Sequence, residues 1–279
     1  MPAMIAFLGC GEMNEAIMAG LLTAGTSPDR VVATVRSADR AAALRGSYPG
    51  VTVISTEENP DGNRAACIGA AVVVLGVAPG ATAELARAVG PALRRDAVVV
   101  SVAAALPLAQ LEAALPEGQA VVRSMPNTPL KVGRGIVSLT PGSSCTSAQL
   151  QQARSIFEGS GTVVEVPEEQ IALVSAISGS GPAYAYYLAE AMAAAGAGLG
   201  LEPGLAELLA RETVAGAGLM LAAPGATASA LRQAMTGPET ITSRAIAVFE
   251  ERGLPGIIAE GAGATVKRTG EVTARLVRN

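Results

Sequence analysis

Short apolar segments and helix-like patterns alternate along the first half of the chain. The apolar segments are rich in β-branched residues and fall at residues 4–8, 31–35, 51–54, 72–75, 97–100 and 120–122. Several are apolar throughout, which is typical of strands buried on both faces of a parallel sheet. Between the segments, apolar residues recur with helical spacing, as at Met13, Ile17 and Leu21. This alternation predicts a doubly wound α/β domain with a parallel sheet over residues 1–166.

The pattern changes near Pro167, beyond which almost no strand signal remains. Helical patterns, separated by Gly and Pro, cover residues 168–198, 203–223, 227–234, 242–252 and 255–276. Small residues occupy every face of the stretch Ala191–Gly198, so close packing against other helices is expected. An all-helical half with so little charge favours an oligomer; ordinary buried helices in a monomer are the alternative. We therefore predict a second, helical domain over residues 167–279.

The composition excludes several kinds of chemistry. None of the 279 residues is His, which excludes His-based catalytic triads. Because His is also the commonest metal ligand, a metal site is not expected. The net charge is −4 and no basic block is present, so a nucleic-acid partner is not expected. The most apolar run, residues 70–78, is far shorter than the ~20 residues that span a membrane. Without a signal-peptide pattern or a disulfide framework, the expected location is cytoplasmic.

A glycine-rich turn follows the first predicted strand and opens the first predicted helix. The turn reads GCGEMN at residues 9–14. In this position, Gly9 allows a tight turn, Gly11 allows a pyrophosphate to approach the backbone, and the helix N-terminus offers free amides. A dinucleotide site is therefore predicted. Asn14 replaces the usual third glycine, and Glu12 brings a carboxylate that weakens phosphate binding unless it turns away.

The end of the second predicted strand distinguishes NADP from NAD. Enzymes that use NAD carry an acidic residue there, which binds the ribose 2′-hydroxyl. This chain instead has Arg36 and Ser37, with Arg40 one turn later, and these groups suit a 2′-phosphate. Asp39 is displaced from the acidic position and suits the first turn of a helix. The alternative to phosphate binding is that the whole segment is simply the solvated start of a helix. NADPH is the expected cofactor, with NADH possible.

Several later segments together resemble one enzyme family. They are RSMPNTP at 123–129 with Val132, Gly133 and Gly135, SGSGPAY at 178–184, RETVAG at 211–216, and MTGPETIT at 235–242 with Ala245, Ile246, Phe249 and Glu250. Over the whole length, the chain resembles pyrroline-5-carboxylate reductases, which make proline from its cyclic imine with NAD(P)H. The resemblance implies an N-terminal Rossmann-type doubly wound parallel sheet and a C-terminal all-helical dimerisation domain. It also implies a homodimer, commonly assembled as a pentamer of dimers, with each active site between one chain's cofactor and the partner's signature loop.

The resemblance also assigns roles to individual residues. The cofactor-binding positions are Gly9, Cys10, Gly11, Glu12, Met13, Arg36, Ser37, Asn63, Val77, Ala78, Pro79, Ala103, Ala104, Met125 and Asn127. The substrate-binding positions are Ser178, Gly179, Pro182, Thr240 and Ile241. Thr242 falls where the family has a hydroxyl beside the imine nitrogen, and it becomes the expected catalytic residue. From the residues alone, Thr242 also suits a helix N-cap, and the two roles are compatible.

The chain departs from the family pattern where the substrate is expected to bind. Glu239 and Thr240 replace a glycine pair whose amides hold the substrate carboxylate in the family, Ala105 replaces another glycine, and Ala78 replaces a lysine. Three functions therefore stay open. The first is NADPH-dependent reduction of a cyclic imine, with 1-pyrroline-5-carboxylate as the expected substrate and L-proline as product. The second is a divergent imine reductase that acts on a substituted pyrroline or a piperideine carboxylate. The third is a non-catalytic NADP-binding oligomer.

Overall fold

The computed structural model describes residues 4–237 and 240–278. The chain forms two compact units, one comprising the segment up to Gly179 together with the segment from Val266 onward, and the other Ser180–Thr265. We call them the sheet unit and the helical unit. These units reflect packing within one chain, and the domain division expected at residue 166 stays a prediction.

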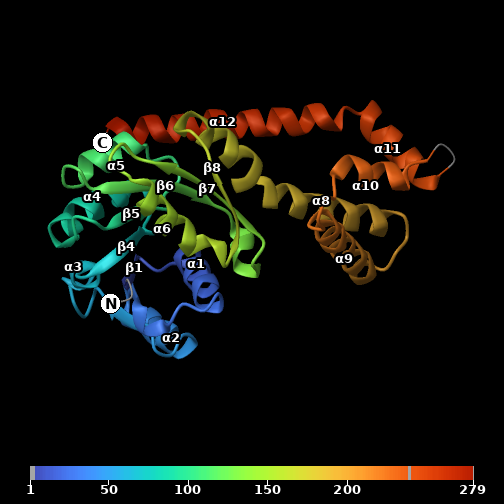
Figure 1. The fold of residues 1–279 in the computed structure, drawn as a ribbon. Coiled ribbons are helices and arrows are strands. Elements are labelled where there is room, and N and C mark those ends of the chain that lie inside the picture. Colours follow the sequence, from blue (N-terminus) through green and yellow to red (C-terminus); the bar gives the residue numbers. More distant parts are fainter. Residues whose placement is uncertain (1–3, 238–239, 279) are drawn as a thin grey trace. The chain divides into compact units, whose positions relative to one another are not determined.

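The described residues of the sheet unit contain an eight-stranded sheet with the order β3-β2-β1-β4-β5-β6-β7-β8 (Figure 1). The strands are β1 (Met4–Leu8), β2 (Val31–Val35), β3 (Thr52–Ser55), β4 (Ala70–Leu75), β5 (Val98–Ser101), β6 (Ala120–Pro126), β7 (Gly135–Pro141) and β8 (Gly161–Glu165). The first six run parallel, whereas β7 is antiparallel to β6 and parallel to β8. The six predicted strands and the doubly wound parallel arrangement are confirmed, with β7 and β8 as additions at one edge.

Part of the family-like segment 123–129 is strand. Arg123 to Pro126 belong to β6 and pair with β7. Neither β7 nor β8 carries the mainly apolar segment that predicts the other strands, because β7 includes Gly135, Ser138 and Thr140 and β8 has only two consecutive apolar residues, Val163 and Val164. Burial of β7 against its neighbours overrides this weak local signal.

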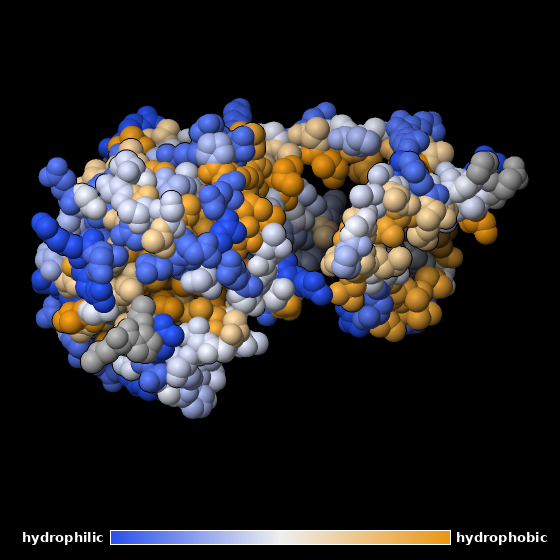
Figure 2. All heavy atoms as spheres, viewed as in Figure 1, coloured by the Kyte–Doolittle hydropathy of each residue, from blue (hydrophilic) through white to orange (hydrophobic). Residues whose placement is uncertain are grey.

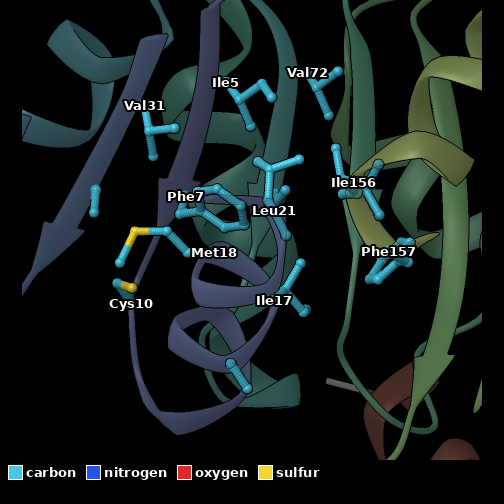
Figure 3. Close-up of a cluster of buried hydrophobic side chains, with 14 of the residues drawn as sticks. Ile5, Phe7, Cys10, Ile17, Met18, Leu21, Val31, Val72, Ile156 and Phe157 are labelled. Carbon is cyan, nitrogen blue, oxygen red and sulfur yellow. The ribbon is translucent and has the colours of Figure 1, made fainter. Parts of the chain in front are cut away.

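Helices cover both faces of the sheet. They are α1 (Glu12–Thr23), α2 (Ala38–Ser47), α3 (Gly62–Cys67), α4 (Pro79–Val89), α5 (Leu108–Ala114) and α6 (Ser147–Glu158). Successive strand residues point to opposite faces, so Phe7 packs with Ile17 of α1 and Phe157 of α6 (Figure 3), whereas Leu8 packs with residues of α3, α4 and α5. Two apolar layers therefore hold the sheet, and β1 contributes to both.

The segment expected as one helix over residues 168–198 is interrupted. A short turn of helix, α7 (Ile171–Val174), leads into a π-helical turn at Ser175–Gly179, and α8 (Gly181–Gly198) then begins afresh. Pro182, in the first turn of α8, has no N–H to continue the preceding hydrogen-bond ladder. The interruption coincides with the boundary between the two units.

The helical unit has its side chains largely open to solvent in the single chain. It contains α8, α9 (Pro203–Leu221), α10 (Ala228–Met235), α11 (Ile241–Glu251) and the first part of α12 (Leu254–Arg278). Among its described residues only Ala206 and Ala210 are buried, while many Leu, Tyr and Met side chains are exposed. Figure 2 shows hydrophobic residues at the surface of this unit. The helices predicted after residue 200 are confirmed. None of the described helices is both long and apolar enough to cross a membrane.

Candidate cofactor site

A cavity of about 440 Å³ lies beyond the carboxyl ends of β1, β2 and β4. Its lining residues are Gly9, Cys10, Gly11, Thr34, Val35, Arg36, Ser37, Arg40, Thr56, Asn63, Gly76, Val77 and Ala78. The strand order reverses between β1 and β4, and open α/β sheets bind ligands at such a switch point. The cavity brings together eight of the residues expected to bind the cofactor.

The two glycines of the turn have different geometric roles. Gly9 has a φ of +71°, and a Cβ added there would lie 2.5 Å from Val77 Cγ1. Both the backbone conformation and the contact with the segment after β4 therefore require glycine. Gly11 has extended backbone, and no neighbouring atom lies within 4 Å of where its Cβ would be. This open space beside the backbone suits the close approach of a phosphate.

The amides of the turn itself are already bonded within the protein. Gly9 N–H donates to Thr34 Oγ1 (3.0 Å), Cys10 N–H to the Thr34 carbonyl (2.6 Å), and Gly11 N–H to the Gly9 carbonyl (2.8 Å). No side chain caps the N-terminus of α1. The first-turn amides, beginning with Glu12 and Met13, are therefore the donors left for an anion.

Asn14 occupies the third-glycine position and is almost completely buried. Its Nδ2 donates to the Leu8 and Gly9 carbonyls at 3.3 and 3.4 Å, so it joins α1 to the end of β1. A Cβ on Gly76 would lie 2.1 Å from Asn14 Nδ2. The space that Asn14 needs is thus provided by a glycine after β4.

Glu12 does not line the cavity. Its carboxylate is exposed and accepts a hydrogen bond from Lys131 Nζ (2.9 Å), which lies in the turn of 3₁₀ helix at Thr128–Val132. The hydrogen bond and charge of Lys131 lower the pKa of Glu12. The expected repulsion of the pyrophosphate is therefore reduced by an ion pair between residues far apart in the sequence.

Arg40 is held at the cavity by an acidic residue of α1. Its guanidinium forms an ion pair with Glu15, and Tyr48 Oη donates to the other carboxylate oxygen of Glu15 (3.2 Å). Burial and the charge of Glu15 raise the pKa of Tyr48. Ser37 lines the cavity and also caps α2, because its Oγ accepts the Arg40 N–H at 3.3 Å. Arg36 is exposed at the rim.

Asp39 and Cys10 contribute no charge to the cavity lining. Asp39 is exposed in the first turn of α2 and lies outside the lining, as expected for a helix start. Burial raises the pKa of the Cys10 thiol to about 12, so it is neutral at physiological pH. The charged groups of the lining are therefore two arginines, which suit an anionic ligand.

Seven of the expected cofactor residues lie outside this cavity. They are Glu12, Met13, Pro79, Ala103, Ala104, Met125 and Asn127. Asn127 is buried and bonded on both sides, since its Oδ1 accepts the Ile136 N–H (2.9 Å) and its Nδ2 donates to the Ser178 carbonyl (3.1 Å). A Cβ on Gly179 would lie 2.8 Å from Met125 Cε. The sheet unit therefore brings two expected cofactor residues next to two expected substrate residues.

The other expected substrate residues belong to the helical unit. Pro182 begins α8, and Thr240 and Ile241 begin α11. The N-cap of α11 is Thr240, whose side chain accepts the Ser243 N–H at 3.3 Å, so the N-cap role considered for Thr242 is wrong. Thr242 lies one residue inside the helix because the capping geometry is satisfied two residues earlier. Glu239 lies outside the described residues.

Four lining residues had not been identified from the sequence: Thr34, Val35, Thr56 and Gly76. Thr34 is the single polar residue of the apolar segment VVATV, and this exception is the sequence feature that could have identified it as a site residue. A polar group in a buried strand must be hydrogen-bonded, so its position in the sequence predicts a partner without naming it.

Comparison with known proteins identifies relatives along the whole chain. The family model for pyrroline-5-carboxylate reductase dimerisation matches residues 168–272, and the model for NADP oxidoreductase coenzyme F420-dependent matches residues 4–105. The chain is 35% identical over 273 residues to a pyrroline-5-carboxylate reductase of Pseudomonas aeruginosa, covering 98% of this chain and 97% of the relative. It is 32% identical over 257 residues to one of Escherichia coli, covering 92% and 93%.

Solved structures agree with the sequence relatives. A pyrroline-5-carboxylate reductase from Coxiella burnetii superposes with a TM-score of 0.90 at 33% identity, covering 98% of this chain and 99% of that chain. The Plasmodium falciparum pyrroline carboxylate reductase with NADP bound superposes with a TM-score of 0.81 at 22% identity, over 98% of both chains, which speaks for the fold alone.

Proposed function

The chain belongs to the pyrroline-5-carboxylate reductase family, and we propose on this basis that it reduces 1-pyrroline-5-carboxylate to L-proline with NADPH. The observation that carries the proposal is the cavity at the strand switch point, whose lining includes Arg36, Ser37 and Arg40 as well as Gly11, the residue that precedes the uncapped first turn of α1. This combination suits a dinucleotide with an additional phosphate.

The residues of the cavity fit the cofactor in charge and in space. The open backbone at Gly11 would accommodate the pyrophosphate, and the amides of Glu12 and Met13 would donate to it. The guanidinium groups of Arg36 and Arg40 would bind the 2′-phosphate, and Asn63, which also lines the cavity, would contact the adenosine end. When bound, NADPH supplies the hydride for the C=N bond.

The remaining cofactor positions are proposed from the family resemblance. Val77, Ala78 and Pro79 follow β4, Ala103 and Ala104 follow β5, and Met125 and Asn127 lie at the end of β6. We place the last two near the nicotinamide. Their proximity to Ser178 and Gly179 supports this placement, because the substrate must meet the reduced ring.

The substrate positions extend into the helical unit. We propose that Pro182, Thr240, Ile241 and Thr242 bind the substrate in the homodimer, with the Thr242 hydroxyl oxygen accepting the N–H of the protonated imine and so orienting it. Since a protonated imine is already electrophilic, the protein has only to orient it and exclude water. The same proposal includes a homodimer, with dimers assembled further into a pentamer of dimers. It also includes a division into domains of residues 1–166 and 167–279.

The three free cysteines support a cytoplasmic location.

A second candidate function is the reduction of a different cyclic imine. Thr240 stands where the family has glycine, and its hydroxyl is engaged with the Gly237 carbonyl (3.0 Å) as it caps α11. Ile241 follows with a side chain that is 92% exposed. A stiffer and larger loop of this kind favours a substrate with a different arrangement around its carboxylate.

The test is a steady-state panel of cyclic imines with NADPH and NADH. We expect NADPH oxidation to accelerate most with 1-pyrroline-5-carboxylate and to be slower with NADH. A higher kcat/KM for a piperideine carboxylate or a substituted pyrroline would establish the second candidate. NADPH binding without turnover of any imine would contradict both and would point to a non-catalytic oligomer.

A further inference from the structure

Thr34 is a polar residue inside an otherwise apolar strand. It is 1% exposed, and Val31, Ala33 and Val35 of the same strand are buried apolar residues. A buried hydroxyl lowers stability unless both its donor and its acceptor functions are used. The partners of Thr34 therefore indicate why the strand carries it.

Both functions of the Thr34 hydroxyl are directed to the cofactor cavity. Oγ1 accepts the N–H of Gly9 at 3.0 Å and donates its single proton to Oδ1 of Asn63 at 2.6 Å. Gly9, Thr34 and Asn63 all line the cavity and come from the turn after β1, from β2 and from α3. One hydroxyl thus connects three segments of the site.

This bond determines which way the Asn63 amide faces. Because Oδ1 is engaged by a hydroxyl donor, the NH₂ group is the end that remains. Asn63 is half-buried at the cavity, and its Nδ2 has no acceptor among the residues that the structure describes. Two N–H donors at the wall of an anion-binding cavity suit ribose or phosphate oxygens.

We propose that Thr34 is a positioning residue for cofactor binding, which orients Asn63 so that its amide N–H groups are presented to the cofactor. The inference rests on the proposed function, because it assumes that the cavity binds NADPH. It goes beyond that function by assigning a role to a residue that does not itself need to contact the cofactor.

The alternative is that Thr34 only stabilises the glycine turn through Gly9. The two roles differ in their dependence on Asn63. If Thr34 acts through Asn63, removing its hydroxyl matters only when the amide is present. If it acts through the turn alone, the loss is the same with or without the amide.

The experiment measures the NADPH dissociation constant by fluorescence titration for the full-length protein and five variants. Thr34→Val is expected to raise the dissociation constant about fivefold, which is roughly the effect of one lost hydrogen bond. Thr34→Ser, which keeps the hydroxyl, should stay within about twofold of wild type. Asn63→Ala should also raise the dissociation constant. Adding Thr34→Val to Asn63→Ala should then change this constant by less than about twofold.

Asn63→Asp tests the donor without touching Thr34. It keeps an oxygen for the Thr34 hydroxyl but has no N–H groups, so NADPH should bind at least as weakly as to Asn63→Ala. Wild-type affinity in Asn63→Asp would overturn the proposal, even if Thr34→Val failed to fold. An equal loss from Thr34→Val with and without Asn63 would also overturn it. Failure of the wild type to bind NADPH would instead overturn the proposed function.

Discussion

Ala105 adopts a backbone conformation that favours glycine. Its φ is +63°, and among the described non-glycine residues it alone has a positive φ. The residue is buried, and its carbonyl accepts a hydrogen bond from Thr273 Oγ1 (2.9 Å) near the end of α12. The left-handed conformation costs an L-residue about 1–2 kcal/mol, so this turn carries strain that the surrounding contacts maintain.

Replacing Ala105 with glycine should therefore stabilise the protein. We expect Ala105→Gly to raise the free energy of unfolding by up to about 1 kcal/mol, since relief of strain exceeds the added freedom of the unfolded chain. Ala104→Gly is the matched control and should be neutral or destabilising. Urea unfolding measures both, and a loss of stability in Ala105→Gly would contradict the argument.

The pair of Glu12 and Lys131 also acts at the scale of single residues. Lys131→Met leaves the Glu12 carboxylate unpaired beside the amides proposed to bind the pyrophosphate. We expect the KM for NADPH to rise about two- to fivefold, with a larger effect at low ionic strength because both groups are exposed. Adding Glu12→Gln to Lys131→Met should restore the KM. Equal KM values for the single and double variants would show that Glu12 has no such effect.

At the scale of elements, the start of α11 gives different structural roles to two threonines that look alike in the sequence. Thr240 caps the helix, whereas Thr242 lies in its first turn. We expect Thr240→Ala to lower the free energy of unfolding by about 1 kcal/mol through loss of the cap. Thr242→Val keeps a β-branched residue of similar helix propensity, so its stability should be near that of wild type.

Enzyme kinetics should show the opposite order. Thr242→Val removes the hydroxyl proposed to orient the imine, and kcat should fall about tenfold or more. The KM for NADPH should be unchanged, because Thr242 is not assigned to the cofactor. A Thr242→Val variant with wild-type kcat would exclude Thr242 from the reaction.

At the scale of the whole molecule, the helical unit exposes more apolar side chains than a solvent-facing surface usually carries. In the single chain α8, α10, α11 and α12 bury no residue among those described, and Leu219 of α9 is 63% exposed. Apolar exposure on this scale marks an association surface, in agreement with the dimerisation family model that covers the region. Small side chains on α8 allow close packing of helices.

A charge placed on this surface should weaken assembly. We expect Leu219→Glu to raise the dissociation constant of the oligomer at least about tenfold, because an unpaired carboxylate would be buried. Ile68→Glu is the control, since Ile68 is 72% exposed but lies in the sheet unit. Analytical ultracentrifugation distinguishes the species. A Leu219→Glu variant with unchanged assembly would place the interface elsewhere.

Much of the architecture follows from local patterns in the sequence. Short, mainly apolar segments predict β1 to β6, helical spacing predicts the helices beyond residue 200, and the glycine turn with Arg36 and Ser37 locates the cavity proposed to bind the cofactor. These features are encoded within a few neighbouring residues, because strand burial, helix amphipathicity and tight turns depend on local chemistry.

The features that only the folded chain reveals are contacts between distant residues. Thr34 meets Asn63, Glu12 meets Lys131, and Asn127 meets Ser178 across separations of 29, 119 and 51 residues. Such pairs leave no periodic signal, since each partner is compatible with many neighbours until the sheet brings them together. The glycine turn therefore predicts that a dinucleotide binds, whereas tertiary contacts establish which amides and side chains remain free to hold it.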